Sequence, residues 1–140
     1  MNEHELYELI AVYLQTQYPD AVYRFDLAAD LKLTPGQARK HKKLHPVRGY
    51  PDLFLAEPAP RCVDGSWNYE YNGLFIEIKK EGTRLKNKKG EWATEHIKEQ
   101  ADMLEELQFR GYRAVFAVGF EEVKKIIDEY LGSILNEEEI

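Results

Sequence analysis

The chain contains little cysteine and no long apolar run. Cys62 is the one cysteine among 140 residues, which excludes an internal disulfide bond and fits a reducing compartment. No run approaches the length of a membrane span, and the polar N-terminal residues lack the basic and then apolar layout of a secretory signal. We therefore expect a cytoplasmic protein with no membrane partner, in which Cys62 is a loop residue without a chemical role.

Several familiar catalytic and metal-binding patterns are also missing. The sequence has no Gly-rich phosphate loop of the Walker type and no serine-nucleophile elbow. His41 and His45 have the spacing of two zinc ligands on one helix face, but only Cys62 and distant histidines could complete such a site. Pro46 would also end that helix. We therefore interpret both histidines as part of a basic surface and expect no zinc.

The charge balance is acidic, but the charges are unevenly distributed. The net charge is −6, whereas proteins that bind nucleic acid usually carry a basic face. The basic residues form two clusters, at 39–48 and 79–89, and the acidic excess lies elsewhere. Either cluster alone is typical of a solvated surface. Because the two clusters flank the acidic motif described below, we expect a groove for DNA.

The hydrophobic pattern predicts alternating helices and strands in one globular domain over residues 1–140, with 44% hydrophobic and 12% aromatic content. Thr34 and Pro35 mark the start of a short basic helix, and Thr94 and Gly111 mark the ends of a longer one. In chain order we expect a helix at 3–18, a strand at 21–27, the basic helix, strands at 52–56 and 74–80 around a variable loop, a helix at 94–110, a strand at 113–118 and a helix at 120–131.

Two connections predict the fold class. The strands at 52–56 and 74–80 can pair as an antiparallel hairpin centred near Gly65. The later strand, helix and strand form a crossover, which places two strands in parallel. The prediction is an α/β fold with a mixed central β-sheet flanked by helices.

A motif of two acids and a lysine lies on the predicted hairpin. Glu77 and Lys79 are two residues apart on a strand, so both side chains project from the same face. Asp52 begins the partner strand and comes to lie across from them. Carboxylate oxygens suit Mg²⁺ or Mn²⁺, and a lysine beside the ion can hold or help deprotonate a water. The motif therefore predicts metal-assisted phosphodiester hydrolysis.

Each of these residues, taken alone, has a simpler interpretation. Asp52 follows Pro51 and could be an ordinary turn residue. Glu77 and Lys79 could form a solvent-facing charge pair that contributes little. We favour the site because all three residues lie on apolar strands whose pairing brings them together.

The motif also resembles a known family. Pro51-Asp52, a spacer and Glu77-Ile78-Lys79 resemble the PD-(D/E)xK nuclease superfamily, and the surrounding segments resemble its VRR-NUC branch, the virus-type replication-repair nucleases. The supporting segments are 2–6, 47–53, 73–80 and 100–115, so the resemblance covers nearly the whole chain. It implies a restriction-endonuclease-like core and a DNA endonuclease selective for branched DNA, such as a Holliday junction or a flap.

The resemblance assigns a role to each residue of the motif. It implies that Asp52 and Glu77 bind the metal together with the backbone carbonyl of Ile78, and that Lys79 positions or activates the water. Gln100 matches the family's helix glutamine near the catalytic lysine. The spacing of apolar residues independently places Gln100 on the core-facing side of its helix, where a purely structural amide would also need a partner.

The first helix supplies one further candidate ligand. Glu3 matches the acidic residue that the family carries there and would complete the metal shell directly or through water. Glu5 and Glu8 are neighbouring alternatives, and an acid at a helix start is also favoured by the helix dipole. The resemblance further implies a homodimer, set against a two-fold DNA junction, in a bacterial or phage-infected host cell. The alternative function is a non-catalytic DNA-binding or interaction module that keeps the nuclease fold.

Overall fold

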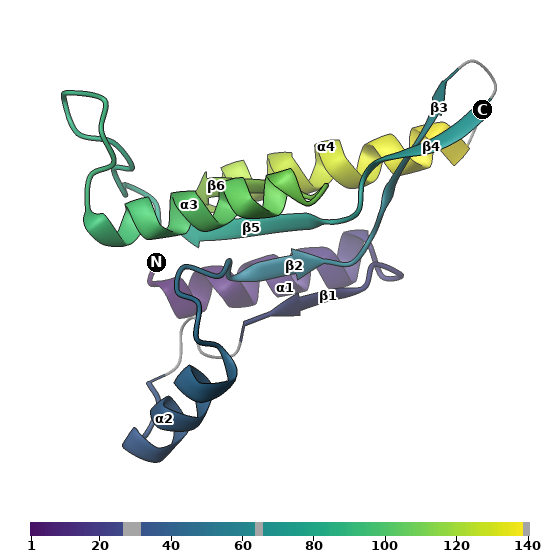
Figure 1. Cartoon of the computed structure of the whole chain (residues 1–140). Helices are drawn as coiled ribbons and strands as arrows, with labels where there is room; N and C mark the ends of the chain where they lie inside the picture. Colours follow the sequence, from purple (N-terminus) through teal and green to yellow (C-terminus); the bar gives the residue numbers. More distant parts are fainter. Residues whose placement is uncertain (27–31, 64–65, 139–140) are drawn as a thin grey trace.

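The computed structural model describes residues 1–26, 32–63 and 66–138 (Figure 1). These residues form four helices and six strands. None of the described helices is long and apolar enough to cross a membrane. The elements are α1 (Glu3–Gln17), β1 (Tyr23–Phe25), α2 (Pro35–Leu44), β2 (Leu53–Leu55), β3 (Ala59–Val63), β4 (Ser66–Tyr71), β5 (Leu74–Lys79), α3 (Glu95–Phe109), β6 (Arg113–Val118) and α4 (Phe120–Glu138).

The central sheet has four strands in the order β1-β2-β5-β6. The pairs β1–β2 and β2–β5 are antiparallel, and β5–β6 is parallel because α3 carries the chain back across the sheet. Helices α1 and α4 pack together on one face of the sheet, and α3 covers the other (Figure 1). This arrangement confirms the predicted α/β fold with a mixed central sheet.

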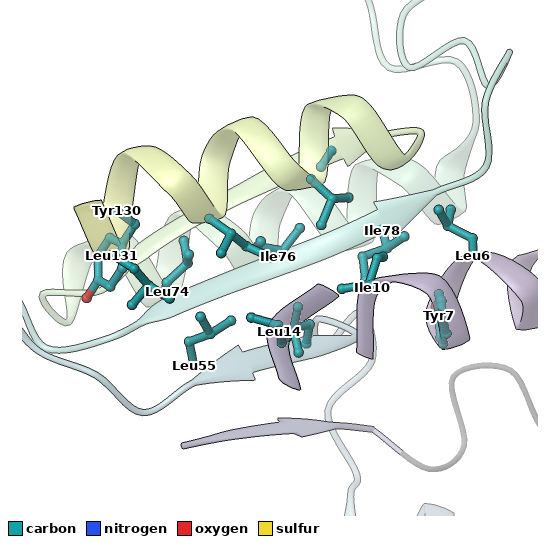
Figure 2. Packing of buried hydrophobic residues seen from close by; sticks show 14 of the residues in the cluster. Leu6, Tyr7, Ile10, Leu14, Leu55, Leu74, Ile76, Ile78, Tyr130 and Leu131 are labelled. Carbon is teal, nitrogen blue, oxygen red and sulfur yellow. The ribbon is translucent and has the colours of Figure 1, made fainter. Parts of the chain in front are cut away.

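The larger core cluster lies between the sheet, α1 and α4 (Figure 2). Helix α1 buries Leu6, Tyr7, Ile10 and Leu14 there, whereas Leu9, which also fits the helical spacing, is 36% exposed. The tyrosine hydroxyls of Tyr13 and Tyr18 both donate to Asp128 of α4. These contacts hold α1 and α4 together on one face of β5. The other cluster members are Leu53, Leu55, Ala59, Leu74, Ile76, Ile78, Ala117, Val123, Ile127, Tyr130 and Leu131.

A second, smaller cluster lies on the α3 face of the sheet. Phe75 packs there with Leu104 and Leu107 of α3 and Ala114 of β6. Because alternate residues of a strand share a face, Glu77 also points toward α3, while the flanking isoleucines of β5 join the larger cluster. The strand alternation predicted from the sequence is therefore confirmed.

The segment between β2 and β5 differs from the prediction of a variable loop. It forms a second two-stranded sheet, in which β3 and β4 pair antiparallel and extend away from the central sheet (Figure 1). Cys62, expected in a loop, lies in β3 opposite Trp67. The expected hairpin centre at Gly65, like the predicted strand end at position 27, lies outside the described residues. The prolines of this segment favour a loop, but the alternating Trp, Tyr and Tyr of β4 favour a strand, and the strand forms.

The helix ends follow their capping residues. The Thr94 hydroxyl accepts from the backbone of Ile97 at the start of α3, and Gly111 follows its end with a φ of +90°. Thr34 caps α2, and Pro35 occupies its first turn. All four residues act as predicted. Helix α4, by contrast, continues past Leu131 to Glu138.

Gly49 brings the segment before β2 into direct contact with α3. Its φ is +83°, and an added Cβ would lie 2.8 Å from the Glu99 carbonyl oxygen and 3.2 Å from the Gln100 Cα. Gly90 has a similar φ of +81° but has open space around it. A substitution at Gly90 therefore tests backbone strain alone, whereas a substitution at Gly49 tests strain together with close packing.

We expect Gly49→Ala to lower the free energy of unfolding by about 2–6 kcal/mol, since strain of about 1–3 kcal/mol adds to overpacking of similar size. Gly90→Ala should show only the strain of positive φ, at the low end of about 1–3 kcal/mol. Urea unfolding of both variants measures the difference. Equal losses in the two variants would mean that the contact between Gly49 and α3 contributes nothing.

Candidate active site

Strand pairing brings Asp52 and Glu77 together at one end of the sheet. Leu53 pairs with Ile76, so the preceding Asp52 lies opposite Glu77. The Asp52 carboxylate Oδ2 accepts a 2.7 Å hydrogen bond from the backbone N–H of Ile78. Asp52 is only 7% exposed and Glu77 only 2%. Two carboxyl groups are thus buried side by side, as the sequence motif predicted.

Gln100 and Lys79 both approach the Glu77 carboxyl group. The Gln100 side-chain Nε2 donates to Glu77 Oε1 over 2.6 Å, from a position on α3 where the residue is 6% exposed. The Lys79 ammonium nitrogen lies 3.8 Å from the same oxygen. The four residues predicted as catalytic therefore form one cluster, contributed by β5, α3 and the residue preceding β2.

Burial shifts the acidity of both carboxyl groups. Loss of solvent raises the pKa of Asp52 to about 6, although the hydrogen bond from the Ile78 backbone opposes the shift. Loss of solvent, and then repulsion from Asp52, raises the pKa of Glu77 to about 9, against the attraction of Lys79. Despite Lys79, the pair therefore holds a proton at neutral pH when no cation is bound. Such a pair is a favourable place for a cation.

Two buried oxygen atoms of the cluster have no hydrogen-bond partner among the described residues. They are Glu77 Oε2 and Gln100 Oε1. An unsatisfied buried acceptor is unfavourable by about 1–3 kcal/mol. Carboxylate and carbonyl oxygens are the ligands that Mg²⁺ and Mn²⁺ take, and a cation would both satisfy these atoms and favour the ionised carboxylates. The residues present therefore fit a hard divalent cation.

A comparison with solved structures gives the family of the fold. No family profile matches the sequence, and no curated protein matches it significantly. A solved structure described as a VRR_NUC domain protein matches this chain with a TM-score of 0.65 and 25% sequence identity. The match covers 95% of this chain and 90% of the other. The chain has the fold of a VRR-NUC domain. The resemblance inferred from the motif is thereby supported over nearly its full length.

The VRR-NUC fold of this chain is a nuclease-family fold. The fifth side chain predicted for the site, Glu3, lies at the edge of the cluster. Glu3 is exposed at the first residue of α1, and with Met1, Asn2, His4 and Lys80 it lines an open hollow of about 540 Å³. Its negative charge contributes to the raised pKa of Glu77. Among the described residues, no three Asp, Glu, His or Cys side chains are grouped closely enough to hold a metal. The role of Glu3 in metal binding therefore stays a prediction.

Two residues beside the candidate site were not predicted from the sequence. Tyr7 of α1 is buried, and loss of solvent followed by the charge of Asp52 raises the pKa of its hydroxyl, so it remains a neutral donor. His96 is exposed one turn before Gln100, and its Nε2 lies 3.3 Å from the Gln100 side-chain nitrogen. The spacing of four residues between His96 and Gln100 was a visible signal. No local pattern links Tyr7 to Asp52, because the two lie on different elements.

Proposed function

We propose that this chain is a Mg²⁺- or Mn²⁺-dependent endodeoxyribonuclease that hydrolyses phosphodiester bonds, with selectivity for branched DNA. The observation that supports it most is the buried pair Asp52 and Glu77, which lies beside unpartnered oxygen atoms and beside Lys79. A solved VRR_NUC domain protein shares the fold. The hydrolysis itself, the metal and the branched substrate are parts of the proposal.

Two carboxylates and one backbone carbonyl would bind the cation, and hydrogen bonds would hold the carboxylates in place. Asp52, Glu77 and the Ile78 carbonyl would hold the cation, which when bound lowers the pKa of a water and stabilises negative charge on the phosphoryl oxygen. Hydrogen bonds fix both carboxylates: Ile78 N–H donates to Asp52, and Gln100 donates to Glu77.

Lys79 supplies a positive charge beside the attacking water. Its ammonium group is largely buried, with 13% of the side chain exposed, and donates hydrogen bonds only. It can therefore orient the water or neutralise charge on the phosphate, and can accept the water's proton only after losing its own.

The proposal includes a homodimer, which would explain the selectivity for branched DNA. Its two active sites would lie on the two symmetry-related halves of a two-fold junction. Light scattering would then find a species of twice 16.4 kDa, whereas a 16.4 kDa species alone would exclude the dimer. The proposal places this activity in the cytoplasm of a bacterial or phage-infected cell.

The proposed function is tested by cleavage of labelled single-stranded, duplex, flap, splayed and four-way-junction DNA in Mg²⁺, Mn²⁺ or EDTA. We expect metal-dependent cutting, fastest on a branched substrate, that is lost in Lys79→Ala and in Asp52→Asn. Cutting that persists in EDTA or in both variants would contradict the assigned site. DNA binding without cutting by the folded wild type would favour the non-catalytic module instead.

A further inference from the structure

Helix α2 buries no residue against the rest of the described molecule. None of its residues is buried, and in Figure 1 it lies apart from the sheet, below β1 and β2. Its hydrogen bonds are internal, formed by the capping box of Thr34 and Gln37 and by the helical backbone. A ten-residue helix is short for stability without packing. Core packing therefore does not explain why α2 is present.

The charges of α2 also have no ion-pair partner among the described residues. Its ten residues include four cations, Arg39, Lys40, Lys42 and Lys43, and no acid. Several of these lie three or four positions apart, where like charges repel each other. None of them forms an ion pair with a carboxylate of the described residues. The surface is therefore suited to an anion with repeated charges.

The chemistry of α2 favours a nucleic-acid backbone over a protein. Protein interfaces have an apolar core from which lysine is depleted, whereas α2 contributes only Leu44 as a large apolar side chain. Phosphate contacts are made by lysine and arginine and need no apolar core. A second copy of the same helix would meet it with like charge.

The position of α2 connects it to the proposed catalytic site. Seven residues separate its last residue, Leu44, from Asp52. The second half of that connection is fixed on the body of the molecule. Gly49 packs against α3, the Tyr50 ring lies 5.6 Å from the Phe75 ring at a steep angle, and Pro51 is fully buried. The connection therefore joins α2 to the end of the sheet that carries the carboxylate pair.

A second basic segment stands at the same end of the sheet on the opposite side from α2 in Figure 1. This loop, residues 80–94, is braced by its own contacts. The Lys86 ammonium lies 4.5 Å from the centre of the Trp92 ring, and the Asn87 side chain accepts from the backbone of Lys89 and Glu91. Its exposed lysines would face the same substrate from the other side.

We propose that α2 is a phosphate-binding arm, which holds the backbone of a duplex segment of the DNA substrate beside the carboxylate pair. This inference takes DNA as the partner of α2 from the proposed function, but it concerns binding rather than cleavage. The binding role of α2 and the cleavage of DNA can therefore be contradicted independently.

The test is the salt dependence of DNA binding in EDTA, where no cleavage interferes. Fluorescence anisotropy with a labelled four-way junction and a duplex, from 50 to 200 mM KCl, gives the slope of log K against log[salt]. Each phosphate contact contributes about 0.9 to that slope. We expect the double variant Lys40→Gln/Lys43→Gln to bind more weakly and to reduce the slope by about 1.8.

The matched control is Lys124→Gln/Lys125→Gln on α4, which removes the same charge from another surface. We expect this control to keep the wild-type slope, and the α2 variant to keep the wild-type Tm because α2 buries nothing.

An unchanged slope in the α2 variant, or an equal reduction in the control, would overturn the inference. Equal affinity of the wild type for poly-glutamate would also overturn it, in favour of an acidic protein partner. If the α2 variant behaves as expected and the wild type never cuts DNA, the phosphate-binding role of α2 is supported and the nuclease proposal is contradicted.

Discussion

Glu77→Gln is expected to reduce metal-dependent cleavage by about 10²–10³-fold, the loss typical of removing one charged or hydrogen-bonding group that stabilises a transition state. The same change should raise the Tm of the metal-free protein at pH 8. Glu77 is 2% exposed and lies beside Asp52, so its ionised form is unfavourable without a cation. Glutamine has the same shape, carries no charge and can still accept the hydrogen bond from Gln100. A gain in stability with a loss of activity is the expected signature of a functional site.

Glu105→Gln is the control for this prediction. It removes the same charge from an exposed position on α3, so activity and Tm should both stay close to the wild type. Single-turnover cleavage and thermal unfolding measure the two effects. A Glu77→Gln variant that retains more than about a tenth of the activity would show that Glu77 is not essential. A lower Tm at pH 8 would show that the ion pair with Lys79 outweighs the burial of the charge.

Divalent cations are expected to stabilise the protein more at high pH than at low pH. Both carboxyl groups have raised pKa values in the folded protein, so the folded state holds protons more tightly than the unfolded chain. Metal-free stability from this pair is therefore greatest below about pH 4, the ordinary range of these acids, and falls as the pH rises through about 6 and then about 9. A cation needs the ionised carboxylates and offsets that loss.

Thermal unfolding with and without Mn²⁺ between pH 5.5 and pH 8.5 measures this dependence. At a metal concentration 100 times Kd the gain is about 2.7 kcal/mol, which corresponds to several degrees in Tm. We expect a gain of this kind near pH 8, little gain near pH 5.5 and none in Asp52→Asn at either pH. A gain that is independent of pH, or that survives in Asp52→Asn, would place the cation elsewhere.

The local parts of the site could be predicted from the sequence, since they depend on periodicity and short-range pairing. Strand alternation fixes which face of β5 carries Glu77 and Lys79, and the hairpin connection fixes that Asp52 lies opposite. Helical spacing likewise places Gln100 on the buried side of α3. In each case the deciding pattern is the local periodicity of one element or the antiparallel pairing of β2 with β5.

The remaining parts depend on contacts between distant elements. The approach of Gly49 to Glu99 and the position of Tyr7 near Asp52 both require the packed structure, and no local pattern encodes them. The β3–β4 sheet is a different case, because its period-2 aromatic pattern was present but its prolines favoured a loop. Helix α4 continues past Gly132, because one glycine inside a helix is unfavourable by only about 1 kcal/mol and does not end it.

The most direct test of the central claim is a crystal structure of the protein soaked in Mn²⁺, with anomalous scattering used to locate the ion. The account predicts one or more anomalous peaks contacted by Asp52, by Glu77 Oε2 and by the Ile78 carbonyl, in the position where the buried oxygen atoms lack partners. A well-ordered site with no peak between Asp52 and Glu77, or with Mn²⁺ bound only elsewhere, would contradict it.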